Sequence, residues 1–183
     1  MTATAATNAL EFLREQVVSA WDWLETTVSD VTGEQANWWP PGSANSIGAT
    51  YLHVVIYPDV EINRLLYGRV PIIEADWDGD VGQGSNYDPN RFDDWVRGVR
   101  VQWERLHDYG RSVHAWLVGS LDALTQNDLE RPVDMSRSGL GMWQGHDLYV
   151  LHGFRHVYMH GGEIACLKGL QGAKGYLGGV DAL

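Results

Sequence analysis

The apolar residues of this chain recur with helical spacing in four long segments, which prolines and glycines separate. In the first segment the apolar side chains follow one another at steps of three and four residues: Leu10, Leu13, Val17, Trp21, Leu24 and Val28. This spacing places them on one face of an α-helix. Three further segments show helical spacing, at about 46–68, 88–117 and 144–169. Because no stretch shows strand-like alternation of comparable strength, we predict an all-α protein, a four-helix bundle with long connections.

Two of these segments begin with recognisable helix-start signals. Asn45 or Ser46 is a suitable cap for the second segment. Asp88 caps the third segment, and Pro89 stands in its first turn, where the missing N–H has no consequence. The connections at about 69–87 and 120–143 are long, so at least one of them can cross over the bundle.

The second segment is apolar almost all round its circumference. Such a helix is usually buried on both sides, so we expect it to face a second subunit as well as its own core. Pro58 lies inside it and is expected to kink the helix and free the carbonyl of Val54. The chain shows no repeat or linker that divides it, which predicts a single domain over 1–183, with its core at about 8–170 and a loosely held, glycine-rich tail at 171–183.

Composition excludes several classes of partner. The formal net charge is −11, without a basic cluster, so we expect neither nucleic acid nor an anionic membrane surface as partner. No apolar run reaches the roughly 18–20 residues that span a bilayer, and the N-terminus lacks the features of a signal peptide. The single cysteine, Cys166, excludes an internal disulfide, fits a reducing cytoplasm and is expected to be a small buried residue.

Two histidines four residues apart mark the last helical segment. His156 and His160 fall on one helical face, within a narrow stripe of six residues: Tyr149, His152, His156, His160, Glu163 and Leu167. Burying several imidazoles and a carboxylate without partners is unfavourable, and either a shared metal or a hydrogen-bonded network removes the cost. Spacing alone leaves open whether the stripe binds metal or faces solvent.

A third histidine, His53, lies in the second segment. Three neutral imidazoles that leave one coordination position open form the ligand set of a reactive divalent metal. The stripe leaves one ambiguity, because His152 can replace or supplement His156. The remaining histidines have no partner at helical spacing and are expected to be surface or partly buried residues: His107, His114 and His146.

Several motifs in this order resemble the DinB-like superfamily, which includes the DinB/YfiT-type metalloenzymes. They are the Trp-Trp-Pro-Pro loop at 38–41, the helix start Asn-Ser-Ile at 45–47 that leads to His53, and the late His-x-x-x-His-x-Gly-Glu-Ile at 156–164. The phrases at 31–36 and 124–129 add to the similarity. It extends from about residue 8 to 170.

The resemblance implies an up-down-down-up four-helix bundle, often dimeric, with a three-histidine metal site. Matched by motif, the ligands are His53, His156 and His160, and His152 becomes a neighbour. Glu163 stands where the family often has Gln, and we expect it to hydrogen-bond a ligand from outside the coordination sphere. Zinc is the expected ion, although imidazole ligands also suit nickel and iron.

Related proteins use low-molecular-weight thiols, among them bacillithiol transferases and a mycothiol-dependent maleylpyruvate isomerase. That isomerase carries an additional C-terminal domain, whereas this chain ends after the bundle, so its specific activity is not expected here. The resemblance favours a cytoplasmic metal-dependent transferase that joins such a thiol to small electrophiles. Tyr57, Tyr149 and Glu163 are the candidate catalytic residues.

Two other functions remain open. One is hydrolysis by metal-activated water, although His156 is followed by Val157 and so does not begin a His-Glu-x-x-His motif. The other is a non-catalytic dimeric metal-binding or scaffold protein. A fourth protein ligand from Asp59 or Glu61 would favour that role, because it closes the site.

Overall fold

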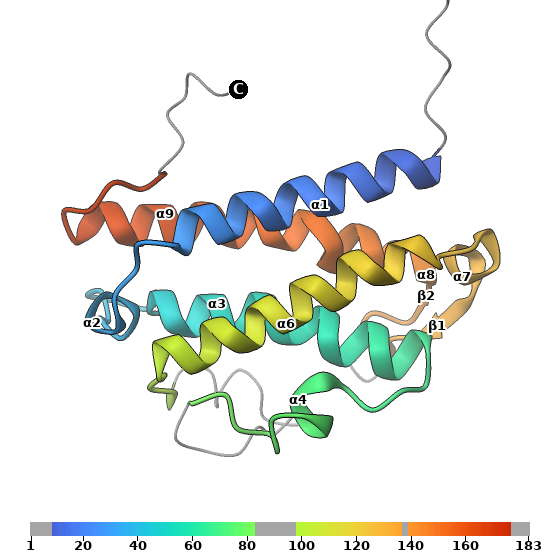
Figure 1. Ribbon diagram of the computed structural model, residues 1–183, viewed down its shortest axis with the longest axis horizontal. Helices are drawn as coiled ribbons and strands as arrows, with labels where there is room; N and C mark the ends of the chain where they lie inside the picture. The colour runs from blue at the N-terminus through green and yellow to red at the C-terminus, as the bar shows by residue number, and fades with distance from the viewer. Residues whose placement is uncertain (1–8, 83–97, 137–138, 177–183) are drawn as a thin grey trace, which may run out of the picture.

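The computed structural model describes residues 9–82, 98–136 and 139–176, and most of them are helical (Figure 1). Within these ranges, four α-helices of at least eleven residues form the main body: α1 (Ala9–Val28), α3 (Ile47–Tyr57), α6 (Trp103–Asp122) and α9 (His156–Leu170). Two π-helical segments extend them, η1 (Pro58–Leu66) after α3 and η3 (Tyr149–Arg155) before α9. The shorter helices are α2 (Gly33–Ala36), α4 (Ile72–Ala75), α7 (Gln126–Glu130) and α8 (Gly145–Leu148). The predicted all-α class is confirmed.

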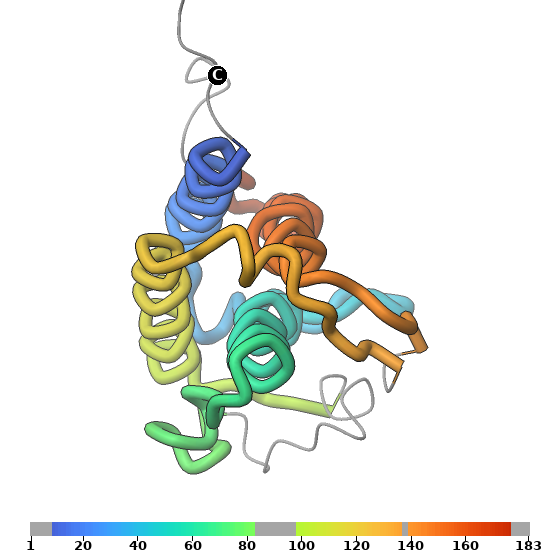
Figure 2. Tube along the Cα trace, turned by 90° about the vertical axis from the view of Figure 1, so that its right-hand side faces the viewer, coloured from blue at the N-terminus to red at the C-terminus, as the bar shows by residue number. Residues whose placement is uncertain are grey.

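The long helices pack side by side around a common core (Figures 1 and 2). α1 contacts η3, α9 and α6, while α3 contacts α9 and α6. Large side chains from all of these helices are completely buried between them, among them Trp21, Leu24, Tyr51, Leu52, Leu106, Tyr109 and Ile164. The predicted single domain over 1–183 remains a prediction.

α3 begins where the sequence indicates and is buried by its own chain. Ser46 is the cap, because its hydroxyl accepts the N–H of Ala49 at 3.1 Å. Every residue from Ile47 to Ile56 is buried except His53. The chain itself therefore accounts for the apolar circumference of this helix, and the predicted dimer loses that supporting argument.

Pro58 changes the type of helix. Its backbone keeps helical angles, φ −59° and ψ −38°, and η1 begins there. Proline has no N–H to donate to the carbonyl of Val54 one turn earlier, so α-helical hydrogen bonding is interrupted at this residue. The wider π-helical turns of η1 follow directly. Such turns are frequent at functional sites.

The predicted third helix is interrupted within its described part. Its start signals, Asp88 and Pro89, lie outside the described residues, but 99–102 are not helical and α6 begins only at Trp103. The side chain of Asn37 explains this, since it accepts the N–H of Val101 at 2.8 Å and donates to its carbonyl at 2.9 Å. These bonds hold Val101 as a neighbouring strand would, at the expense of helical bonds.

The long connection before α8 contains a small hairpin that the sequence did not reveal. Strands β1 (Pro132–Asp134) and β2 (Met142–Gln144) pair antiparallel, with Val133 opposite Trp143. Three residues are too few for alternation to be recognised, and in β1 only Val133 is buried. The sequence therefore predicted only a long connection at this place.

Two further observations concern the C-terminal part. Cys166 is exposed on α9, so the expectation that it is buried is wrong. It shares its helical face with exposed side chains such as Met159 and Leu170. Beyond α9 the ring of Tyr176 packs against Trp23 with centroids 5.5 Å apart, so the tail is held to α1 as far as this residue. In the described residues, none of the helices has the length and apolar character needed to cross a membrane.

Candidate metal centre

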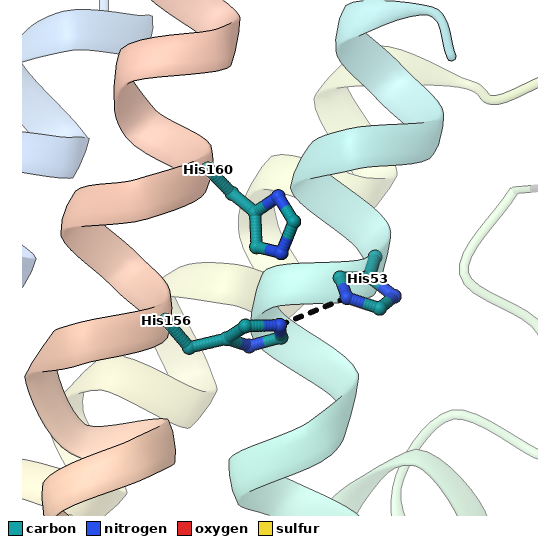
Figure 3. Close-up of side chains that lie close together, drawn as sticks. All are labelled: His53, His156 and His160. Carbon is teal, nitrogen blue, oxygen red and sulfur yellow. Dashed lines mark hydrogen bonds between the residues drawn. The ribbon is translucent and has the colours of Figure 1, made fainter. Parts of the chain in front are cut away.

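Three histidines from two helices converge at the interface between α3 and α9 (Figure 3). His53 projects from α3, and His156 and His160 project from successive turns of α9. One nitrogen from each ring lies within 4.8 Å of the others. The closest pair is the Nε2 atoms of His53 and His156, 2.9 Å apart. Within the described residues this is the only group of three or more histidine, cysteine or acidic side chains positioned to share an ion.

Glycines allow the histidine-bearing helix to lie close to α1. A Cβ atom at Gly161 would lie 2.1 Å from the ring of Trp23, and one at Gly153 would lie 2.8 Å from Val17. With this side of the helix against α1, His156 and His160 point in the opposite direction, toward α3. Gly161, the residue that follows His160, therefore helps to set the distance between α9 and α1, while the two histidines face α3.

Burial keeps two of the rings uncharged. His156 is 8% exposed, and His53 is partly buried. Loss of solvent, followed by repulsion from the neighbouring histidines, lowers the pKa of His53 to about 3 and that of His156 to about 2. Both imidazoles are thus neutral near pH 7, which is the form that ligates metals.

The donor set suits a divalent ion. Tetrahedral bonds of about 2.0–2.1 Å to zinc place two ligand nitrogens about 3.3 Å apart, close to the observed separation of His53 and His156. Nδ1 of His160 lies 2.7 Å from Oε2 of Glu163, so this carboxylate can fix the tautomer that leaves Nε2 for a metal. The hydrogen bond predicted for Glu163 is present. Nδ1 of His156 is buried without a hydrogen-bond partner in the described part of the chain.

Comparison with known proteins agrees with the resemblance found in the motifs. The family model of the DinB superfamily matches residues 16–164, well over half of the chain. The chain belongs to the DinB superfamily. A crystal structure of a conserved protein from Enterococcus faecalis has a similar fold, with a TM-score of 0.72 at 18% identity, over 90% of this chain and 98% of that one. No match was found among curated proteins.

A buried glutamate–histidine pair lies beside the histidine group in this DinB-superfamily protein. His152, on η3, is not part of the converging group; its Nε2 lies 2.6 Å from Oε2 of Glu61, on η1. Its ring stacks on Tyr57, at 3° and 5.5 Å between centroids, and meets the edge of His156. From the sequence, Glu61 was a candidate only for a fourth ligand, and its contact with His152 was not predicted. The available signal was spacing, because Glu61 follows His53 by two helical turns and His152 precedes His156 by one.

The two candidate tyrosines occupy different surroundings. The ring of Tyr57 lies against His53, with centroids 4.8 Å apart, and against His156, at 5.7 Å, so it borders the histidine group. Tyr149 is fully buried, and its hydroxyl lies 3.0 Å from that of Tyr67 and 3.2 Å from that of Ser120. Burial raises its pKa. Tyr149 thus joins a hydroxyl network, while Tyr57 lies at the histidines.

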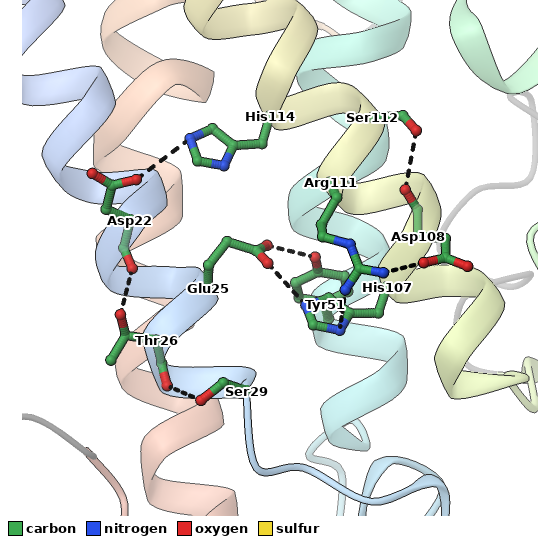
Figure 4. A network of polar contacts seen from close by, with 10 residues as sticks. All are labelled: Asp22, Glu25, Thr26, Ser29, Tyr51, His107, Asp108, Arg111, Ser112 and His114. Atoms are coloured by element: carbon green, nitrogen blue, oxygen red, sulfur yellow. Dashed lines mark hydrogen bonds and ion pairs between the residues drawn. The ribbon is translucent and has the colours of Figure 1, made fainter.

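The remaining histidines belong to other contacts, as expected for surface or partly buried residues. His107 lies 2.8 Å from Glu25, whose other oxygen accepts the hydroxyl of Tyr51 at 2.9 Å, so this network joins α1, α3 and α6 (Figure 4). His114 stacks on Trp21 and approaches Asp22. His146 is exposed, and its Nδ1 lies 3.1 Å from the carbonyl oxygen of Leu129.

Proposed function

We propose that this protein binds one divalent metal ion through His53, His156 and His160 and transfers a low-molecular-weight thiol to small electrophiles. The observation that supports it is the convergence of three imidazoles within 4.8 Å, two of them kept neutral by burial. Zinc is the proposed ion, and nickel and iron share the preference for imidazole. Mycothiol and bacillithiol are examples of the thiol.

A metal at this position would make a bound thiol acidic enough to be deprotonated near neutral pH. The three histidines would hold the ion, and Glu163 would keep the ring of His160 oriented. Tyr57 borders the group and can donate a hydrogen bond to the electrophile. In the transfer, sulfur forms a bond to the electrophilic carbon, the leaving group departs with its bonding electrons, and the thiol proton passes to solvent.

The contacts of the two acidic candidates support an open rather than a closed site. Asp59 is completely buried, and its carboxylate accepts the N–H groups of Ile72 and Ile73 and the hydroxyl of Tyr109. Glu61 contacts His152. Neither belongs to the converging group in the described residues. This favours an enzyme over a structural metal site, while hydrolysis by metal-activated water would use the same open position.

The wider setting of the proposal follows the family resemblance. We infer a cytoplasmic homodimer with small molecules as partners, and the net charge of −11 argues against nucleic acid. We also infer the up-down-down-up order of a four-helix bundle. The colour gradient of Figure 1 supports it, because α1 and α9 run in one direction and α3 and α6 in the other.

Metal content tests the first part of the proposal. Untagged protein, His160→Ala and His146→Ala are purified in parallel and analysed for bound elements. We expect about one zinc or similar ion per chain in the wild type and in His146→Ala, and a loss of most of it in His160→Ala. A wild type without metal, even after reconstitution with zinc, nickel and iron, would contradict the metal site.

Activity tests the second part. Metal-loaded protein is incubated with monochlorobimane and, in turn, mycothiol, bacillithiol and cysteine, and formation of the fluorescent thioether is followed. We expect turnover with one of these thiols and none with His160→Ala. Turnover of ester or amide substrates without thiol would instead support the hydrolase.

A further inference from the structure

The contact between Glu61 and His152 joins the π-helical segments η1 and η3 beside the histidine group. Glu61 lies on η1 and is 7% exposed, while His152 lies on η3 and is 4% exposed. Their closest atoms are 2.6 Å apart. Through the ring of His152, whose centroid is 5.5 Å from that of His156, the carboxylate lies one imidazole away from a proposed ligand.

Glu61 has fewer polar partners than Asp59, the neighbouring buried carboxylate. Asp59, two residues earlier, receives hydrogen bonds from two backbone N–H groups, from Tyr109 and from Asn63. In the described part of the chain, the charged partner of Glu61 is His152, and Oε2 of Glu61 has no hydrogen-bond partner. A buried charge in such a position is unfavourable unless a positive charge lies nearby.

We propose that Glu61, held against His152, is a positioning residue that supplies the negative charge needed to balance the metal. The inference rests on the proposed metal site. Three neutral imidazoles leave the two positive charges of the ion uncompensated. A bound thiolate would offset one of them, and the Glu61 carboxylate would offset the other.

His152 positions the carboxylate of Glu61 beside the histidine group. The short contact with His152 holds the buried carboxylate of Glu61 at a fixed place, one imidazole ring away from His156. Glu163 also carries a carboxylate near the site, but 55% of its side chain is exposed, and solvent screens its charge. The charge of the buried Glu61 is therefore screened less by solvent.

A charge role and a merely structural role predict different results for Glu61→Gln. Loss of a compensating negative charge weakens the binding of a cation but strengthens the binding of an anion at the open position of that cation. Loss of shape or stability weakens both. Comparing the two affinities in one variant therefore separates the explanations.

The experiment uses cobalt(II), which reports its surroundings by visible absorption. Wild type, Glu61→Gln and the exposed control Glu15→Gln are titrated with cobalt against a chromophoric chelator, and the cobalt-loaded proteins are then titrated with azide. We expect about tenfold weaker cobalt binding in Glu61→Gln, the lower end of the effect of such outer contacts, with azide binding several-fold tighter. Glu15→Gln is expected to match the wild type within twofold in both titrations.

The other outcomes are equally decisive. If Glu61→Gln binds cobalt and azide as the wild type does, or binds both more weakly, the charge role is overturned while the metal site stands. A wild type that binds no cobalt overturns the proposed metal site and this inference with it. Should Glu61→Gln fail to fold, Glu61→Asp keeps the charge, and a large loss of cobalt affinity in that variant would equally overturn the inference.

Discussion

His53 and His156 hold their Nε2 atoms 2.9 Å apart in surroundings that oppose a positive charge on either ring. Their pKa values of about 3 and 2 compare with about 6.5 in an unfolded chain. Between these limits the unfolded chain binds more protons than the folded one. Stability must therefore rise with pH in this window, and it is lost as the pH falls below about 6.5.

The variant His156→Gln tests this linkage. In metal-free protein we expect the free energy of unfolding to fall between pH 6.5 and 4.5, and the variant to reduce that slope by about 1 kcal/mol per pH unit, since one pKa unit corresponds to about 1.4 kcal/mol. Urea unfolding at several pH values measures both slopes. The half-exposed His146→Gln is the control, with a slope like that of the wild type. Parallel curves for His156→Gln and wild type would contradict the burial argument.

At this scale the sequence predicted residues whose spacing is regular. His156 and His160 are one turn apart, and the motif around His53 pointed to the third ring of the group that the structure brings together. The contact of Glu61 with His152 depends on how η1 and η3 face each other, which no local pattern contains. The exposure of Cys166 was missed because residue type describes average burial, whereas the helical face decides the individual case.

Among the elements, α9 leaves little space for larger side chains at its contact with α1, while it presents two histidines to α3. Gly161 lies at the contact with α1, where the ring of Trp23 fills the space that a Cβ would need. Gly169, near the end of the same helix, is exposed and has no atom within 4 Å of a Cβ position. These two glycines form a matched pair.

We expect Gly161→Ala to destabilise the protein by about 1–3 kcal/mol, the usual cost of overpacking a tight interface. Gly169→Ala is expected to be neutral or to stabilise the helix by up to about 1 kcal/mol, because alanine is the better helix former. Thermal unfolding of both variants measures the difference. Equal effects would show that α9 does not depend on close contact at Gly161.

The elements that the sequence predicted are those stabilised by their own periodicity and caps. α1 matches its predicted apolar stripe, and Ser46 begins α3 as expected. The interruption before α6 was missed because the side chain of Asn37, 64 residues away, holds Val101 in place of helical bonds. Long-range hydrogen bonds of this kind override helical spacing.

On the scale of the whole molecule, the histidine group joins segments 103 residues apart in the sequence. α3 and α9 come from distant parts of the chain and pack against each other, so an ion between them would bind only where the folded arrangement exists. The all-α class followed from helical spacing alone. The meeting of His53 with α9 did not, because it depends on the packing of the entire bundle.

An ion that binds only the folded state stabilises it by mass action. At free zinc 100-fold above its dissociation constant the gain is about 2.7 kcal/mol, and for a chain of 183 residues each kcal/mol raises Tm by about 2–4 °C. We therefore expect zinc to raise Tm by about 5–10 °C. Calorimetry of chelator-treated protein with and without zinc measures the shift.

The matched variants decide where the zinc acts. His53→Ala removes the one ligand that α3 contributes, so we expect zinc to leave its Tm almost unchanged, whereas His146→Ala keeps the full shift. If His53→Ala gained as much as the wild type, zinc would be stabilising the protein at another place, such as the exposed Cys166. The ion would then not connect α3 to α9, and the proposal that the three histidines bind it together would be wrong.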